Sequence, residues 1–347
     1  MDKGFKKILV RAPNWIGDAV MSLPALSALK ALYPASEISV LAKARVAPVY
    51  FNNPDVSAVI VYDDAGRHKG LLGRFNLASE IKEKGFDAAV LFQNAFDAAF
   101  LSFIAGIPAR VGYARDFRRR LLTLPIDVTP EIKTRHQIQY YLNIVVAMGG
   151  HAPSPSIPAV YLSAEEEQWA KGFLKENSLE GRVLVGAAPG ASYGQAKRWA
   201  PAHFAAALTG LSLGYGAVSL IFGSSVDKAE CEAVSSLIKT QRINLCARLT
   251  LRQFMSLLAH LRVFITNDSG PMHLSAAVGG ATVAIFGSTD PALTGPVGEK
   301  AAVVIKKIVC SPCFDRVCRY GHYKCLSGIS AAEVMDAAGV YISKGAA

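Results

Sequence analysis

A strand, a short polar turn and a helix follow one another in the stretch Val263-Phe264-Ile265-Thr266-Asn267-Asp268-Ser269-Gly270-Pro271-Met272-His273. The apolar run is typical of a buried strand, Gly270 allows a ligand close to the backbone, and Pro271 suits the first turn of a helix. The N–H groups at such a helix start are open, and the helix dipole favours an anion there. This turn predicts an anion-binding site within an α/β fold. A plain helix cap at Asp268 or Ser269 is the competing interpretation.

The alternation of strand and helix extends outward from this stretch in both directions. Apolar runs that suit buried strands are separated by segments with helical spacing, which indicates βαβ units and parallel sheets. The expected strands cover residues 7–11, 37–42, 58–62, 88–92, 182–187, 217–222, 263–266 and 282–286. The expected helices cover residues 16–33, 75–84, 134–148, 202–213, 228–239, 251–260, 271–278 and 330–343; the last has Ser330 as N-cap and Glu333 at the capping-box position.

The length of 347 residues predicts two domains. Residues 149–158 hold two Gly and three Pro, which predicts a linker and places the boundary between residues 1–158 and 159–347. Each half is expected to be a doubly wound, Rossmann-like α/β domain. Such folds bind ligands at the carboxyl ends of their strands, so the ligands are expected in a cleft between the two domains.

The charge of the chain predicts an anionic partner. Lys and Arg number 37 against 27 Asp and Glu, a formal net charge of +10, and 51% of the residues are hydrophobic. The composition excludes a disordered chain, and the length excludes a small domain that depends on disulfide bonds for its stability. Nucleic acid, a phosphorylated substrate and an anionic membrane surface all fit the charge. No apolar run suits a spanning helix or a secretory signal, so a cytoplasmic protein is expected.

Cations and aromatic residues collect in the first domain. They predict the binding of an acceptor that carries phosphates or carboxylates, with a solvated surface as the structural alternative. Nucleic acid is the competing ligand, but no recognition helix or RNP-like motif is visible, so no nucleic-acid partner is expected. The candidate acceptor-binding residues are Asn14, Arg67, His68, Lys69, Arg115, Arg119, Arg120 and His136.

Two further junctions between a strand and a helix carry candidate catalytic groups. Asp18, at the start of the first expected helix, is either an acid favoured by the dipole or a general base that takes a proton from a hydroxyl. Lys197 lies in a glycine-rich loop, where it can bind a phosphate as a compact charge. The same loop contains Gly190-Ala191-Ser192-Tyr193-Gly194, which matches G-x-S-x-G. Pro201 starts the next helix too late for a hydrolase nucleophile elbow.

Several nucleotide-binding motifs are missing from the sequence. No G-x-G-x-x-G follows the first strand and there is no Walker A motif, which argues against nicotinamide and ATPase functions. There is also no D-x-D pair, which sugar-nucleotide enzymes use to hold a divalent ion. A departing nucleoside diphosphate would therefore have to be stabilised without an obvious metal.

Four cysteines, Cys310, Cys313, Cys318 and Cys325, gather near the C-terminus with His322 among them. Four thiolates can hold zinc in a tetrahedral cage. The second pair lacks the spacing of a zinc ribbon, and a compact loop with reduced thiols is the alternative. We therefore expect no metal, and these four cysteines are the candidate ligands if zinc binds.

Four stretches together give the chain a resemblance to a known family: residues 8–18, 189–199, 267–273 and 310–325. Over nearly its whole length the chain resembles the ADP-heptose:lipopolysaccharide heptosyltransferases of glycosyltransferase family 9. Its Arg-Ala-Pro-Asn-Trp start and its Cys-rich stretch are more similar to the second heptosyltransferase than to the first. The resemblance implies a GT-B fold, with the acceptor on the N-terminal domain and ADP-heptose on the C-terminal one. It also implies an inverting transfer without a metal.

The resemblance also implies roles for individual residues. Asp18 falls at the base that deprotonates the acceptor, Lys197 at the lysine facing the diphosphate, and Asp268 at the acid near the donor sugar. The other implied donor-binding residues are Ser269, Gly270 and His273, with Asp227 and Glu230 as alternative adenosine contacts.

The implied partners are ADP-heptose as a substrate, an inner-core lipopolysaccharide acceptor and the inner face of the cytoplasmic membrane. No cofactor and a monomer are expected. Three other functions stay open at this stage. Heptosyltransferase I or another family 9 enzyme would differ in its acceptor or sugar. A basic nucleic-acid-binding protein fits the charge, and a sugar-nucleotide epimerase can share the two-domain architecture.

Overall fold

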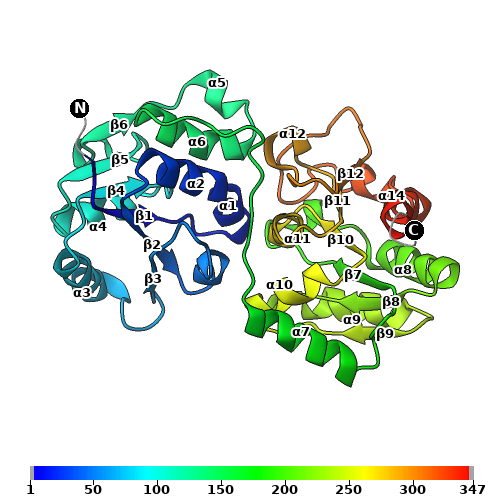
Figure 1. The fold of residues 1–347 in the computed structure, drawn as a ribbon. Coiled ribbons are helices and arrows are strands. Elements are labelled where there is room, and N and C mark those ends of the chain that lie inside the picture. Colours follow the sequence, from blue (N-terminus) through cyan, green and yellow to red (C-terminus); the bar gives the residue numbers. More distant parts are fainter. Residues whose placement is uncertain (1–3, 344–347) are drawn as a thin grey trace. The chain divides into compact units, whose positions relative to one another are not determined.

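The chain divides into two compact units, the first ending at Tyr161 and the second beginning at Leu162. The structure, a computed structural model, describes residues 4–343. Each unit holds one six-stranded sheet with helices packed on it (Figure 1). Residues 151–163, which include most of the expected linker, form no helix or strand. Within the described residues, each helix lacks the length or the apolar character needed to cross a bilayer.

The first sheet is parallel throughout and has the order β3-β2-β1-β4-β5-β6. Its central strand is apolar on both faces because helices cover both, and Ile8, Leu9 and Val10 are all buried. The register sets Val10 opposite Val40 and Val90. The strands are β1 (Lys7–Arg11), β2 (Glu37–Lys43), β3 (Ala58–Tyr62), β4 (Ala88–Leu91), β5 (Ala109–Tyr113) and β6 (Leu124–Ile126).

Two groups of helices form the outer layers of the first unit. Leu9 packs in one cluster with Leu77 of α3 and Leu101 of α4, which places both helices on one face of the sheet. Helices α1 and α2 pack against α6 on the other face (Figure 1). The bounds are α1 (Ile16–Met21), α2 (Leu23–Leu32), α3 (Gly70–Glu83), α4 (Phe96–Ile104), α5 (Pro130–Lys133) and α6 (Gln137–Ala147), with short 3-10 turns η1 (Ala47–Tyr50) and η2 (Arg119–Leu121).

Two long helices expected in this unit are in fact interrupted. The helix expected at residues 16–33 breaks at Ser22, because Pro24 has no N–H to continue the hydrogen-bond ladder. The helix expected at residues 134–148 begins only at Gln137, after the separate turn α5. Both predictions were wrong because they followed the spacing of apolar residues, which does not reveal an N-cap such as His136 or the missing N–H of Pro24.

The second sheet repeats the first. Its order is β12-β11-β10-β7-β8-β9. Read from its other edge this is β9-β8-β7-β10-β11-β12, so β7 and β8 occupy the positions that β1 and β2 have in the first sheet. Both sheets have the doubly wound order of a Rossmann-like domain, which confirms the predicted α/β class. The strands are β7 (Leu184–Ala188), β8 (Val218–Ile221), β9 (Arg242–Asn244), β10 (Val263–Asn267), β11 (Thr282–Phe286) and β12 (Ala301–Ile305).

The five helices expected in the second unit lie within two residues of their expected bounds, whereas the helix at residues 164–176 was not predicted. The last helix packs on α8, and Ser330 and Glu333 form the predicted capping box, since each side chain accepts a hydrogen bond from the other's backbone N–H. The bounds are α7 (Ala164–Glu176), α8 (Pro201–Tyr215), α9 (Lys228–Leu237), α10 (Leu251–Ala259), α11 (Gly270–Ala277), α12 (Pro291–Thr294), α13 (Lys324–Ser327) and α14 (Ala331–Ser343), with 3-10 turns η3 (Gln195–Lys197) and η4 (Ser225–Asp227).

Parallel strands all end at the same edge of their sheet. In the first unit this edge carries the loops that follow β1, β3, β4 and β5. In the second unit it carries residues 189–199 after β7 and the turn between β10 and α11. The predicted site residues are therefore gathered at these two edges.

Candidate active site

Asp18 lies in the first turn of α1, directly after the loop that leaves β1. Its Oδ1 accepts a hydrogen bond from the Tyr141 hydroxyl of α6 at 3.1 Å. The carboxylate is only partly buried, and its place in the first turn favours the ionised form. The Tyr141 hydroxyl helps to orient Asp18 while solvent still reaches the carboxylate, an arrangement that suits a general base.

Tyr141 was not singled out in the sequence, because it lies far along the chain from Asp18. Burial and the neighbouring Asp18 charge raise the pKa of Tyr141 well above its usual value, so the phenol keeps its proton and remains a donor. Its ring also packs against Phe92. The tyrosine therefore holds the carboxylate in a fixed position over the whole range of physiological pH.

The loop before Asp18 is fixed by Arg11, which is almost completely buried. Its guanidinium donates to the carbonyl oxygen of Ala12 at 2.6 Å and to Asn14 Oδ1 at 3.0 Å. Arg45 donates to the Asn14 carbonyl oxygen and lies over the exposed Trp15 ring. Asn14, predicted to contact the acceptor, is therefore oriented by two cations at the carboxyl edge of the sheet.

The predicted acceptor-binding arginines lie at the same edge of the first unit. Arg67 pairs with Glu80 at 3.3 Å, and Arg119 pairs with Asp127 at 2.6 Å. Lys69 is the exposed N-cap residue of α3. The remaining two exposed cations of this predicted set are Arg115 and Arg120.

Two histidines of the predicted acceptor set have structural roles. His68 is fully buried, accepts the Asp63 N–H at Nδ1 and contacts Glu80 at Nε2, so both ring nitrogens are engaged within the protein. His136 caps α6 by accepting the Ile138 N–H at Nδ1. The structure thus does not support the prediction that His68 contacts the acceptor. The sequence shows a cationic loop at this position, but it does not show which residues of the loop are buried.

Arg118 is the arginine that shapes the loop between β5 and β6. It is fully buried, donates to the Tyr113 carbonyl oxygen at 2.7 Å and reaches Asn94 Oδ1 at 3.2 Å. Burial lowers the pKa of Arg118 to about 10, which leaves it charged at neutral pH. It fixes the base of the loop whose tip carries Arg115 and Arg119.

In the second unit, Lys197 and Asp268 are brought together as predicted for one site. The Lys197 ammonium lies 2.5 Å from Asp268 Oδ2, and Thr289 donates a hydrogen bond to the same oxygen. Both charged side chains are largely buried. Lys197 also lies over the Tyr193 ring, 4.6 Å from its centroid. An ammonium and a carboxylate are therefore held together at the end of β10.

Asn267 explains why the loop of residues 189–199 keeps its shape. Its side chain donates to the Pro189 carbonyl oxygen at 2.7 Å and accepts the Trp199 N–H at 3.0 Å, so it joins both ends of the loop. Trp199 is buried and donates to the Ile329 carbonyl oxygen. The loop continues into η3 rather than a helix, so Ser192 does not stand on a hydrolase elbow.

The predicted phosphate turn begins α11. Ser269 is its N-cap, and its hydroxyl donates to the Asn267 carbonyl oxygen instead of capping the helix. Pro271 has no N–H and the Met272 N–H donates to the Ser269 carbonyl oxygen at 3.1 Å, so the N–H groups of Ser269 and Gly270 are those placed to bind an anion. His273 follows in the same helix and is buried.

The two predicted adenosine acids both bind groups of the protein. Asp227 accepts hydrogen bonds from the N–H of Ser224 at 2.9 Å and from its hydroxyl at 2.6 Å. It also packs on Gly190, where an added Cβ would lie 2.1 Å from its Oδ1. Glu230 pairs with Arg198 of the glycine-rich loop. Both acids stabilise the loops around the site.

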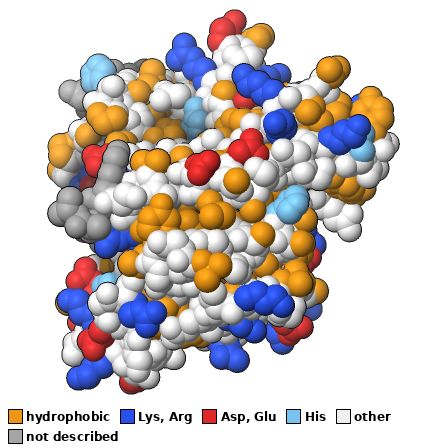
Figure 2. All heavy atoms as spheres, turned by 90° about the vertical axis from the view of Figure 1, so that its right-hand side faces the viewer, with side chains coloured by type: hydrophobic (Ala, Val, Ile, Leu, Met, Phe, Trp, Pro, Cys, Tyr) orange, Lys and Arg blue, Asp and Glu red, His pale blue; other side chains and the backbone are white. Residues whose placement is uncertain are grey.

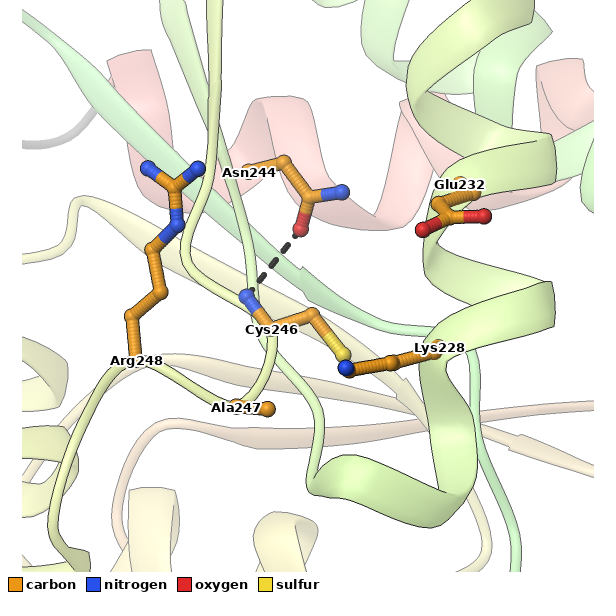
Figure 3. Close-up of a pocket in the computed structure, with 6 residues that line it drawn as sticks. All are labelled: Lys228, Glu232, Asn244, Cys246, Ala247 and Arg248. Atoms are coloured by element: carbon orange, nitrogen blue, oxygen red, sulfur yellow. Dashed lines mark hydrogen bonds between the residues drawn. The ribbon is translucent and has the colours of Figure 1, made fainter.

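A cavity of about 310 Å³ lies beside these acids, between α9 and the segment after β9 (Figure 3). Asn244 at the end of β9 accepts the Cys246 N–H at 3.0 Å and so shapes one wall. This cavity was not predicted from the sequence, because its walls come from two separate elements. Its lining residues are Lys228, Glu232, Asn244, Cys246, Ala247 and Arg248.

The cysteine cluster forms a compact loop around a cavity of about 20 Å³ that all four thiols line. Burial raises the pKa of Cys325, whereas backbone N–H groups, first that of Tyr323, lower the pKa of Cys318. Among residues 4–343, no group of three or more His, Cys, Asp or Glu side chains is arranged to hold a metal ion. The structure thus adds no support to the zinc hypothesis.

Comparison with known proteins places this geometry in a family. Residues 74–324 match the glycosyltransferase family 9 (heptosyltransferase) domain. The chain belongs to glycosyltransferase family 9. It is 33% identical over 307 residues to lipopolysaccharide heptosyltransferase 2 of Salmonella typhimurium, covering 86% of this chain and 87% of that protein. It is 29% identical over 340 residues to lipooligosaccharide heptosyltransferase 2 of Campylobacter jejuni, covering 96% and 97%.

Solved structures of the family share the fold. The Escherichia coli ADP-heptose LPS heptosyltransferase II matches with a TM-score of 0.84 and 28% identity over 98% of this chain and all of that one. A family 9 glycosyltransferase of Veillonella parvula matches with a TM-score of 0.89 and 25% identity over 99% of both chains. These matches confirm the predicted GT-B type of fold, and the family 9 chain is a glycosyltransferase.

Proposed function

We propose that this family 9 enzyme transfers a heptose from ADP-heptose to the inner core of lipopolysaccharide, adding the second heptose to the first. The names of its relatives supply the substrate class. The observation that carries the proposal is the Lys197–Asp268 pair beside the open N–H groups at the start of α11. An ammonium next to a helix N-terminus is suited to a diphosphate.

The nucleotide fits along the carboxyl edge of the second sheet. Lys197 follows β7, and the cavity lined by Glu232 and Asn244 lies at β9, two strands away. Two strand spacings are roughly 10 Å, about the reach from a diphosphate to its base. We therefore place the diphosphate at Lys197 and the nucleoside in this cavity, with Glu232 available to accept a hydrogen bond.

The reaction needs one base and one anion site. The acceptor hydroxyl attacks the anomeric carbon from the side opposite ADP, its oxygen forming the new bond as the bond to the diphosphate oxygen breaks. Asp18 takes the hydroxyl proton, and ADP departs with the bonding electron pair. Attack from the opposite side inverts the anomeric centre.

The departing ADP is stabilised without a metal in this proposal. Lys197 is paired with Asp268 in the free enzyme and turns toward the diphosphate as its charge grows. The N–H groups of Ser269 and Gly270 supply further donors, and a preorganised donor of this kind contributes about 2.7–4 kcal/mol to the transition state. Transfer should therefore persist when divalent ions are chelated.

In this proposal the donor is soluble and the acceptor is anchored in a membrane, so the enzyme works at the inner face of the cytoplasmic membrane. We also propose that it acts as a monomer. The proposed function is tested with purified enzyme, ADP-heptose and two acceptors, one carrying a single core heptose and one carrying none. Mass spectrometry should show one added heptose on the first acceptor alone. Addition to the heptose-free acceptor would instead indicate heptosyltransferase I, and no addition to either would refute heptose transfer.

A further inference from the structure

Five large apolar side chains stand in solvent at the carboxyl edge of the first sheet. We call them the apolar rim: Leu71, Leu72 and Phe75 of α3, Phe96 of α4, and Phe117 in the loop before η2. Leu72 is 79% exposed and Phe117 is completely exposed. Each lies shortly after β3, β4 or β5, so the edge that gathers the acceptor-binding candidates also gathers these side chains.

The segments that carry the rim lie side by side. Helix α3 packs against α4, and α4 packs against η2. Arg74 of α3 lies 3.0 Å from Asp97 of α4, which joins the two helices next to Phe75 and Phe96. The buried faces of α3 and α4 share one core cluster through Leu77 and Leu101. The rim is therefore one surface on a rigid support.

The core does not require these side chains. The inner face of α3 is supplied by Leu77, Ala78 and Ile81, all buried. Leu71, Leu72 and Phe75 form a second apolar stripe on the outside of the same helix. An exposed apolar patch of this kind, surrounded by polar residues, marks an interaction surface.

Cations surround the rim. Lys69 precedes Leu71, Arg74 lies beside Phe75, and Arg115 and Arg120 flank Phe117. In the described part of the chain, Lys69, Arg115 and Arg120 form no ion pair, so their charge is available to a partner. Apolar side chains with Lys and Arg around them match a bilayer interface, where acyl chains lie beneath anionic headgroups.

We propose that the apolar rim and its cations dock the first unit on the surface of a bilayer that contains anionic lipids. A second copy of the chain is the less suitable occupant, because two such faces would bring cations against cations. The proposal rests on the proposed function for its lipid-anchored acceptor, which docking would hold at the edge that carries Asp18. Binding to vesicles without acceptor tests it independently of transfer.

The test measures co-sedimentation of the full chain with vesicles of phosphatidylcholine, with and without phosphatidylglycerol. The variant Leu72→Ser/Phe75→Ser removes two exposed rim side chains and should keep the fold. Its matched control is Leu213→Ser on α8, where a leucine is 77% exposed. Figure 2 shows the side of the molecule that lies on the right in Figure 1, where α8 is found, and hydrophobic side chains are exposed on that side too. The control therefore tests whether an exposed apolar side chain is by itself sufficient for vesicle binding.

We expect the wild type and Leu213→Ser to bind the anionic vesicles, with added salt weakening both. The rim variant should bind about tenfold more weakly or worse. Transfer to a deacylated, water-soluble acceptor should be unchanged in the rim variant, while transfer to acceptor embedded in vesicles should fall. Adding Phe117→Ser should weaken binding further.

Three results would overturn the docking proposal: wild-type chain that stays in solution with anionic vesicles, rim and control variants that bind equally, or light scattering that shows a dimer dissolved by the rim substitutions. Loss of heptose transfer to every acceptor, with rim-dependent vesicle binding intact, would refute the proposed function and leave the docking surface standing. The two proposals therefore fail separately.

Discussion

Among single residues, one carboxylate is central to the proposed catalysis. Asp18 is held by Tyr141 and remains partly exposed. Replacing Asp18 with Asn removes the proton acceptor and keeps the hydrogen bond from Tyr141. We expect kcat to fall by about 10²–10⁴ while ADP affinity stays the same, because the proposed nucleotide site is in the other unit.

Steady-state transfer assays and calorimetry with ADP measure this prediction for Asp18→Asn. Glu83→Gln, an exposed acid at the end of α3, is the matched control and should transfer at the wild-type rate. Near-normal kcat in Asp18→Asn would remove this residue from the mechanism.

Tyr141 gives a prediction about pH. A hydrogen bond donated to a carboxylate stabilises its charged form, so removing the donor raises the pKa of that carboxyl group. In Tyr141→Phe the acidic limb of the kcat/KM profile should therefore move to higher pH, because Asp18 must be ionised to accept a proton. An unmoved limb with a normal melting temperature would show that the 3.1 Å contact does not tune the base.

In the proposed function, Lys197 binds the diphosphate. Lys197→Ala should weaken ADP binding by about 10–100-fold, the effect of losing one charge-assisted hydrogen bond. It also leaves the buried Asp268 without its cation, so thermal unfolding must be measured alongside calorimetry. Lys175→Ala, on the exposed side of α7, controls for the loss of charge. Unchanged ADP affinity in folded Lys197→Ala would contradict the assignment.

At the scale of elements, Asn267 determines the shape of the glycine-rich loop. Asn267→Ala leaves the buried Pro189 carbonyl and Trp199 N–H without partners. We expect the free energy of unfolding to fall by about 1–3 kcal/mol, with weaker ADP binding because Lys197 shares the loop. Chemical denaturation measures the first effect. Asn177→Ala, an exposed helix end, should change stability far less, and equal losses would show that Asn267 has no special role.

The sequence predicted most inner strands and the turn at 267–273, because long apolar runs and small polar junctions are local signals. It missed β5, β6, β9 and β12. The last three are edge strands that carry polar or half-exposed residues, and in β5 Arg110 and Gly112 interrupt the apolar run. It placed Lys197 and Asp268 in one site without revealing that they pair. Tyr141 reaches Asp18, and Thr289 reaches Asp268, from segments distant in the sequence, and only packing reveals such partners.

In the molecule as a whole, two units with the same sheet topology have different proposed roles. The first unit presents a carboxylate, the candidate acceptor-binding cations and the apolar rim at its carboxyl edge, and the second presents an ammonium and a helix start. The net charge of +10 is consistent with an anionic donor, a phosphorylated acceptor and a lipid surface. The chain belongs to glycosyltransferase family 9, and the proposed function assigns these features to one glycosyl transfer.

The proposed diphosphate site is best tested by a crystal structure of the enzyme with ADP. We predict that the Lys197 ammonium leaves Asp268 and lies about 2.7–2.9 Å from a diphosphate oxygen, with the N–H groups of Ser269 and Gly270 on the same diphosphate. A diphosphate bound elsewhere, with Lys197 still paired to Asp268, would contradict the account.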